Sequence, residues 1–238
     1  MFQNLAVSLL AQKYNLVAHY DMIDEFRALG FRLHSGSRRL DPSYAVPLDD
    51  KVLRHLLENS ATSTKRGFRI EHPYSYFQTP WFATVLRSTV IPSMRASLLA
   101  ANQWRDRFGA NNDTCVHMRL GTYKDPIPPV SAHFFEDIDA AIGTPTGSVF
   151  IATDNATAAG VVALLRKFNA VLLHPRDYSA VQTVQFIASC RRLVLTDGTM
   201  GWLAGTLAFQ SSVRYVPRPQ IWHGDIYVFS DWERFGGS

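Results

Sequence analysis

The sequence lacks several features that would identify a class of protein at once. It holds two cysteines in 238 residues, Cys115 and Cys190, and their wide separation gives neither a disulfide framework nor a metal-binding spacing. No apolar run reaches the roughly 20 residues that cross a bilayer. Residues 1–4 carry no basic segment of a signal peptide. We therefore expect buried free thiols and a reducing, cytoplasmic location. This expectation also applies if the chain is one domain of a longer protein.

Signatures of common enzyme classes are missing too. The sequence contains no Gly-x-Ser-x-Gly elbow, no Walker loop and no His-Glu-x-x-His. Its Asp-x-Asp segment, Asp137-Ile138-Asp139, falls inside a predicted helix. A Mn²⁺ or Mg²⁺ ion bound to a diphosphate would need such carboxylates in a loop just after a strand. We therefore expect no metal site.

Charge is modest and dispersed. The formal charge is +4, and 19 of the 24 basic residues are Arg, in no run longer than a pair. Nucleic-acid binding would concentrate these residues in a stripe, so we expect no nucleic-acid partner. Dispersed Arg suits small phosphate ligands, because the guanidinium pairs with phosphate oxygens bidentately. For most of these residues a solvated basic surface is the ordinary interpretation.

Hydrophobic periodicity divides the chain in two at the polar break of residues 109–113. Residues 1–110 predict a smaller, incomplete α/β domain, which opens with a helix but lacks the strand that should feed it. Residues 111–238 predict a Rossmann-like parallel sheet, because apolar strands alternate with helices. The expected N-terminal elements are a helix at 1–15, a strand at 16–20 and helices near 22–29, 49–59 and up to 108. The expected C-terminal strands are 114–119, 148–153, 170–174, 192–196 and 212–216, and the helices lie near 131–142, 156–168, 180–190 and 199–209.

Candidate ligand-binding residues follow the predicted strands, because ligands of open parallel sheets bind beyond the carboxyl ends of the strands. His117 and Arg119 lie two apart and so share one face of their strand. The charge of Arg119 needs an anionic partner, which is either a carboxylate such as Asp154 or Asp197, or a diphosphate. Spacing does not choose between these partners.

A second anion-binding element is predicted where a helix begins after the fourth of these strands. Gly198 and Gly201 flank Thr199 there, so main-chain N–H groups can approach a ligand closely. A helix N-terminus carries about half a positive charge and readily binds phosphate. An ordinary capped helix start has the same sequence, and this second interpretation stays open.

Five segments resemble motifs of the α-1,2-fucosyltransferases, glycosyltransferase family 11, in the order of that family. The strand at 116–123 resembles the family's His-x-Arg-Arg-Gly-Asp-Tyr, with Leu120 and Thr122 in place of the second Arg and the Asp. Residues 150–155 resemble its Ser/Thr-Asp-Asp strand end, with Asn155 as the last residue. The remaining segments are 1–4, 76–79 and 187–202. In the last of these Gly201 departs from the family pattern, and so does Leu203 just after it.

The resemblance implies a GT-B-like, inverting, metal-independent glycosyltransferase. Its co-substrate would be GDP-fucose or a related nucleoside-diphosphate deoxyhexose such as a rhamnose donor, with no other cofactor, and its acceptor a glycan. By carry-over, Arg119 would bind the β-phosphate and stabilise the leaving diphosphate. The amide of Asn155 in place of a carboxylate leaves the base open between guanine, uracil and thymine. The implied donor site is His117, Arg119, Asp154, Asn155, Asp197, Gly198 and Thr199, and the implied acceptor site is Tyr76, Phe77, Gln78 and Tyr123.

Two rival functions remain open from the sequence. The departures from the family motifs also fit a non-catalytic nucleotide- or glycan-binding module. A basic nucleic-acid-binding α/β domain is supported by net charge alone. For the enzyme, neither spacing nor resemblance chooses the general base between Asp125 and His117.

Overall fold

The computed structural model describes residues 1–70, 76–121, 131–217 and 225–236. The chain folds into two compact units. Unit 1 comprises Met1–Met94 with His223–Ile226, and unit 2 comprises Arg95–Trp222 with Tyr227–Ser238. The boundary expected from the sequence, between residues 110 and 111, falls inside unit 2, after a short helical lead-in to its sheet.

The helices of unit 1 begin and end at recognisable signals. Helix α1 spans Phe2–Tyr14, buries Phe2, Leu5 and Leu10, and ends at Asn15 in the left-handed conformation. Asp49 caps α3 (Asp50–Glu58) by accepting a hydrogen bond from the main-chain N–H of Val52 at 2.8 Å. The other helical segments are α2 (Ile23–Ala28), α4 (Pro80–Val85), the π-helical turn η2 (Leu86–Val90) and α5 (Ile91–Ser93).

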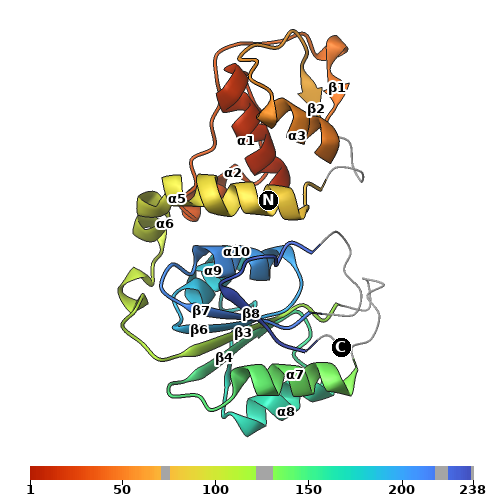
Figure 1. Cartoon of the computed structure of the whole chain (residues 1–238). Helices are drawn as coiled ribbons and strands as arrows, with labels where there is room; N and C mark the ends of the chain where they lie inside the picture. The colour runs from red at the N-terminus through yellow and green to blue at the C-terminus, as the bar shows by residue number, and fades with distance from the viewer. Residues whose placement is uncertain (71–75, 122–130, 218–224, 237–238) are drawn as a thin grey trace. The chain divides into compact units, whose positions relative to one another are not determined.

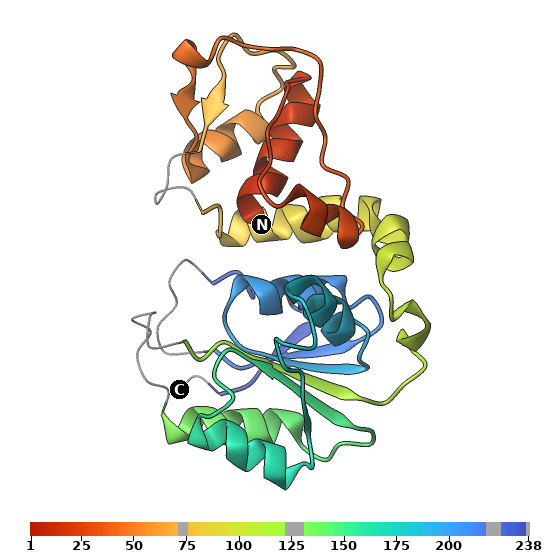
Figure 2. The same cartoon turned by 180° about the vertical axis from the view of Figure 1, so that it is seen from behind.

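Extended structure in unit 1 is sparse. Strands β1 (Val46–Pro47) and β2 (Phe68–Arg69), which follow the 3₁₀ turn η1 (Pro42–Tyr44), form a two-stranded parallel sheet. The prediction of a strand at 16–20 is wrong, because only a single parallel bridge, between Leu16 and Arg38, forms there. Leu16 instead donates its N–H back to the carbonyl of Ala11 at 3.0 Å, so it continues the end of α1. Figure 2 shows α1, α3 and the β1–β2 pair from behind.

Unit 2 is built on a six-stranded parallel sheet in the order β5-β4-β3-β6-β7-β8. The α/β class and the Rossmann-like sheet expected from the sequence are confirmed. The short, mixed strand β8 was not expected, since Trp232-Glu233-Arg234 carries no apolar run. The strands are β3 (Thr114–Met118), β4 (Val149–Thr153), β5 (Val171–Leu172), β6 (Arg192–Leu195), β7 (Ser212–Tyr215) and β8 (Trp232–Arg234).

Helices cover both faces of this sheet (Figure 1). Helices α7 (Ala132–Ile142) and α8 (Ala159–Lys167) lie on one face, and α9 (Ala180–Ala188) and α10 (Thr199–Leu207) lie on the other. Helix α6 (Arg95–Ala101) and the 3₁₀ turn η3 (Arg105–Arg107) lead into β3. The core beneath α7 and α8 includes Val116, Met118, Phe134, Ile138 and Val161, all buried. No helix in the described ranges is long and apolar enough to cross a membrane.

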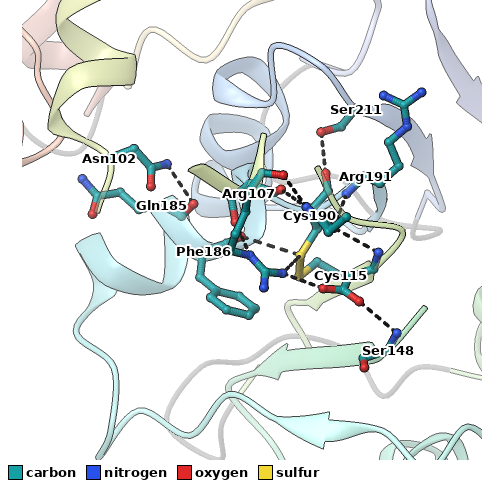
Figure 3. The surroundings of a disulfide bond; sticks show 12 residues. Asn102, Arg107, Cys115, Ser148, Gln185, Phe186, Cys190, Arg191 and Ser211 are labelled. Carbon is teal, nitrogen blue, oxygen red and sulfur yellow. Dashed lines mark hydrogen bonds and ion pairs between the residues drawn. A yellow bond between two sulfur atoms is a disulfide. The ribbon is translucent and has the colours of Figure 1, made fainter. Parts of the chain in front are cut away.

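The two cysteines correct an expectation. Cys115 and Cys190 form a disulfide, rather than remaining free thiols (Figure 3). They are distant in sequence, but β3 pairs with β6, and their Cα atoms lie 5.9 Å apart, within the usual disulfide range. The Nη2 atom of Arg107 approaches the sulfur of Cys190 at 3.7 Å and pairs with Asp113 at 2.8 Å, and its guanidinium lies over the ring of Phe186. The bond therefore ties together the amino-terminal edge of the sheet.

Candidate functional site

The strand order of unit 2 marks one place on the sheet for a ligand. The chain runs outward from β3 through β4 to β5, and then returns to β6 on the other side of β3. The direction of winding thus reverses between β3 and β6. In open parallel sheets the ligand crevice lies outside the carboxyl ends of the two strands at such a reversal. Here those two ends lead into Arg119 and into residues 196–198.

Arg119 lies directly against the start of α10. A methyl group built on Gly198 would lie 3.5 Å from the Cβ atom of Arg119 and 3.6 Å from its Cγ atom. The main-chain N–H of Arg119 donates to the hydroxyl of Thr196 at 3.0 Å, which joins the two strand ends. The structure therefore brings the aliphatic part of the Arg119 side chain against the helix start, although the sequence separates the two by almost 80 positions.

The guanidinium of Arg119 has a protein partner. Its Nη1 donates to Oδ2 of Asp154 at 2.6 Å, and the Asp154 side chain is 19% exposed where that of Arg119 is 41% exposed. Asp154 also accepts from the main-chain N–H groups of Leu120 at 2.7 Å and Gly121 at 3.1 Å. Of the two partners left open by the sequence, the structure contains the carboxylate. Asp154 fixes the turn after β3 and orients Arg119, while the cation keeps exposed surface.

His117 is buried beneath the first turn of α10, beside Arg119. Its side chain is almost fully buried, and burial lowers the pKa of the imidazole to about 4, with Arg119 acting in the same direction and Asp154 opposing. Its Nδ1 atom has no hydrogen-bond partner in the described part of the chain. A methyl group on Gly201 would lie 2.9 Å from that atom, so a side chain there would force the imidazole to shift. The low pKa leaves His117 uncharged at neutral pH, and its ring lies against Gly201 of α10.

The start of α10 is shaped by its glycine and by two tyrosines. Gly198 is the N-cap, with φ +122° and no side-chain cap, and this backbone conformation favours glycine. The hydroxyl of Tyr227 approaches the carbonyls of Thr196 and Gly198, each at 2.8 Å. The hydroxyl of Tyr215 donates to Asp197, and the two tyrosine rings stack with centroids 4.0 Å apart. Asp197 thus faces Tyr215, and the hydroxyl groups of the two tyrosines hold the loop before α10 in place.

The sequence pattern alone singles out neither tyrosine. Tyr215 is the last residue of β7, and Tyr227 follows a segment that the sequence marks only as a loop. One feature of the sequence could have indicated Tyr215, which lies at the end of a predicted strand. Because the carboxyl ends of parallel strands meet at one edge of the sheet, its phenol is expected to lie near the other strand ends.

Asn155 follows β4 beside Asp154, as expected. Its N–H donates to the hydroxyl of Thr153 at 3.2 Å, and its Oδ1 accepts from the hydroxyl of Thr157 at 3.1 Å. These bonds close a tight turn at the carboxyl end of β4. The side chain is half-buried, two strands from α10 in the sheet order.

The residues expected to bind the acceptor are placed less favourably. Phe77 is fully buried, has φ +56° and packs edge-on against Phe82 in the core of unit 1. Its neighbours Tyr76 and Gln78 are half-buried. Tyr123, and the candidate base Asp125, lie outside the described residues. Acceptor binding at this segment therefore stays a prediction, and within unit 1 Phe77 has a packing role.

This arrangement is suited to binding an anion. A half-exposed guanidinium, a helix start whose N-cap is a glycine without a side-chain cap, and an uncharged imidazole lie at the carboxyl edge of the sheet. Asp137 and Asp139 lie on α7 as expected, and Asp139 pairs with Lys167. Within the described residues, no group of three or more His, Cys, Asp or Glu is placed to hold a metal ion.

Comparisons with known proteins give little further guidance. No family model matches the chain, and no curated protein matches it significantly. Among solved structures, the chain is similar to a crystal structure of POFUT1 in complex with GDP-fucose, with a TM-score of 0.39 and 13% sequence identity. The match covers 77% of this chain and 58% of that one. Similarity at this level assigns no function.

Proposed function

We propose that this protein is a glycosyltransferase that moves a 6-deoxyhexose from a nucleoside-diphosphate sugar to a glycan hydroxyl. The transfer is inverting and metal-independent, and the sugar is fucose, by the sequence resemblance, or rhamnose. The observation that carries the proposal is the contact between Arg119 and Gly198 at the strand-order reversal. A diphosphate bound there would meet the guanidinium on one side and the start of α10 on the other.

In the proposed reaction, an acceptor oxygen attacks the anomeric carbon as the bond from that carbon to the β-phosphate oxygen breaks. The electron pair of the broken bond stays on the diphosphate, and the acceptor proton passes to a base. Charge on the departing phosphate is stabilised by Arg119 and by the main-chain N–H groups at the start of α10, which are fixed before the reaction begins. Asp154 orients Arg119 through their 2.6 Å ion pair.

The role of His117 follows from its protonation state. With a pKa of about 4 it adds no charge to the site at neutral pH. It can donate or accept one hydrogen bond toward a ribose or phosphate group, but it cannot neutralise a phosphate. Arg119 is therefore the cation on which the proposed stabilisation of the leaving group depends.

The test is release of nucleoside diphosphate from GDP-fucose and from a deoxythymidine-diphosphate rhamnose donor. We expect slow hydrolysis by the parent protein and a loss of about a hundredfold or more in Arg119→Ala. Arg166→Ala is the matched control, because it removes an exposed Arg in the last turn of α8. Hydrolysis that is absent in the parent, or equal in Arg119→Ala and Arg166→Ala, would rule out the enzyme.

A non-catalytic nucleotide- or glycan-binding module is the second candidate. The ion pair between Arg119 and Asp154 favours it, because a carboxylate already satisfies part of the guanidinium. Such a module would bind nucleoside diphosphate and release none from the sugar donor. Binding with no turnover in the same experiment identifies it.

The disulfide bears on where the reaction takes place. Disulfides persist in oxidising compartments and are rare in the reducing cytosol. Cys115 and Cys190 are both fully buried and bonded to each other. We therefore propose an oxidising compartment for the reaction, in place of the cytoplasmic location expected from the sequence.

A further inference from the structure

Unit 1 contains a cavity that the proposed function does not use. Its volume is about 830 Å³, within the range of ligand-sized clefts. It is lined by residues 16–19, 38–40 and 67–70, by Ala45 and Leu48 on either side of β1, and by one side of α1 through Asn4, Val7 and Ala11 among others. All of these described residues belong to unit 1.

The lining pattern indicates which part of the backbone faces the cavity. Side chains of an extended segment alternate between two faces, so a cavity on one face is lined by every second residue. Here four successive residues, 67–70, line the cavity, and so do four more, 16–19. Successive residues can all contact one cavity when the main-chain edge of the segment faces it.

The hydrogen bonds of β2 agree with this orientation. Val46 and Leu48 donate their N–H groups to the carbonyls of Gly67 at 3.0 Å and Arg69 at 2.9 Å. Main-chain groups of alternate residues point to opposite edges of a strand, so those of Phe68 and Ile70 point away from β1. Within the described residues β2 pairs with β1 alone, which makes it an edge strand of the two-stranded sheet.

A second parallel pairing also lines the cavity. Leu16 and Arg38 form a parallel bridge, in which Val17 donates to the carbonyl of Arg38 at 2.9 Å. One edge of residues 16–17 is thus taken by residue 38. Two parallel pairings therefore flank the cavity, and α1 covers it with Asn4, Val7 and Ala11, which recur at helical spacing.

Charge at the cavity is mostly positive. Among the described residues that line it, Arg38, Arg39 and Arg69 stand against one carboxylate, Asp21, while the remaining wall is largely apolar. An occupant with apolar side chains along its length and an acidic flank would match both properties. We propose that this cavity is a strand slot, which binds an extended apolar peptide segment with an acidic flank as a strand parallel to β2.

The proposal is tested with a synthetic eight-residue peptide of alternating valine and threonine with a glutamate at each end. It is titrated into the full chain to about 2 mM, since short peptides lose chain entropy on binding. Saturable binding is expected, with slower amide hydrogen exchange at Phe68 and Ile70. The same peptide N-methylated at alternate residues keeps its side chains and loses about three main-chain bonds, so its affinity should fall by about a hundredfold.

A charge variant provides the second measurement. Arg39 is exposed, so Arg39→Glu should leave the fold intact. This substitution should weaken the binding of the acidic peptide and strengthen the binding of a peptide with lysine at each end. No saturable binding, equal affinity of the N-methylated peptide, or binding without exchange protection at Phe68 and Ile70 would overturn the proposal. Because no sugar donor is used, failure here leaves the proposed function of unit 2 untouched.

Discussion

Asp154 holds Arg119 and the turn after β3 in a fixed arrangement. Its two carboxylate oxygens accept from Arg119 and from the main-chain N–H groups of Leu120 and Gly121. The sequence allowed either a carboxylate or a diphosphate as the partner of Arg119, and spacing alone could not decide. The pairing depends on β3 and β4 being neighbours, with Met118 opposite Thr153.

Asp154→Asn should lower the free energy of unfolding by about 1–3 kcal/mol, because two main-chain N–H groups and a guanidinium lose a charged acceptor. The matched control is Asp139→Asn, whose partner Lys167 is largely exposed and which should cost well under about 1 kcal/mol. Urea unfolding of both variants measures the difference. Equal costs would show that Asp154 does not hold the turn after β3.

His117 predicts a dependence of stability on pH. An unfolded histidine has a pKa of about 6.5, whereas burial lowers the pKa of His117 to about 4. Between these values the unfolded chain takes up a proton that the folded chain does not. The free energy of unfolding should therefore fall by about 3 kcal/mol at this residue as pH falls from 6.5 to 4, and stay constant above 6.5.

The measurement compares the parent with His117→Asn, which cannot titrate. Urea unfolding is measured at neutral pH and at about pH 4.5. Between these values the parent should lose more free energy of unfolding than the variant, by most of the roughly 3 kcal/mol. Other groups titrate in both proteins and cancel in the difference. An identical pH dependence would mean that His117 is accessible to protons in the folded protein.

At the scale of elements, the start of α10 depends on groups from three strands. Thr196 follows β6, Arg119 follows β3, and the Tyr215 hydroxyl reaches Asp197 from the end of β7. The sequence predicted the helix start and its glycines correctly, because cap and glycine signals are local. It could not indicate the two tyrosines, since their contacts depend on strand order.

Tyr227→Phe should lower the free energy of unfolding by about 1–2 kcal/mol, because the carbonyls of Thr196 and Gly198 lose a buried donor. It should also weaken nucleoside-diphosphate binding, since the start of α10 is then held less firmly. Tyr178→Phe is the control, because it removes a hydroxyl from a ring that packs on Trp104 and Phe186. Calorimetric titration and urea unfolding test both effects, and matching results for the two variants would contradict this role.

Prediction of the elements was most accurate where the sequence pattern was longest. Helix α1 and strands β3, β4 and β6 lie within one or two residues of their expected bounds, since continuous apolar runs mark buried parallel strands. Strand β8 and the pair β1–β2 were missed, because two or three residues carry no periodicity. The expected strand at 16–20 failed because its partners in unit 1 are confined to one bridge.

At the scale of the whole molecule, the disulfide and the candidate site occupy opposite edges of one sheet. Cys115 lies near the start of β3, and Arg119 follows its end. Sequence separation concealed the bond, because 75 positions intervene between two residues that strand pairing makes neighbours. The disulfide and the candidate site both depend on the order of strands in the sheet, which the sequence does not show.

Thiol titration of the denatured protein should find no free thiol before reduction and both cysteines after it. Reduction should also lower the free energy of unfolding by about 4 kcal/mol, on the loop-entropy estimate for a bond that closes so long a loop. Urea unfolding with and without dithiothreitol measures this loss. Two free thiols in the freshly purified, unreduced protein would contradict the bond.

In the proposed function, Arg119 and the start of α10 together bind a diphosphate. Calorimetric titration with GDP, UDP and dTDP tests it directly, with the parent, Arg119→Ala and the control Arg166→Ala. We expect saturable binding of at least one nucleotide by the parent and by Arg166→Ala, and an affinity lower by about tenfold to a hundredfold in Arg119→Ala. Binding of none of the three, or binding that Arg119→Ala leaves unchanged, would contradict the account.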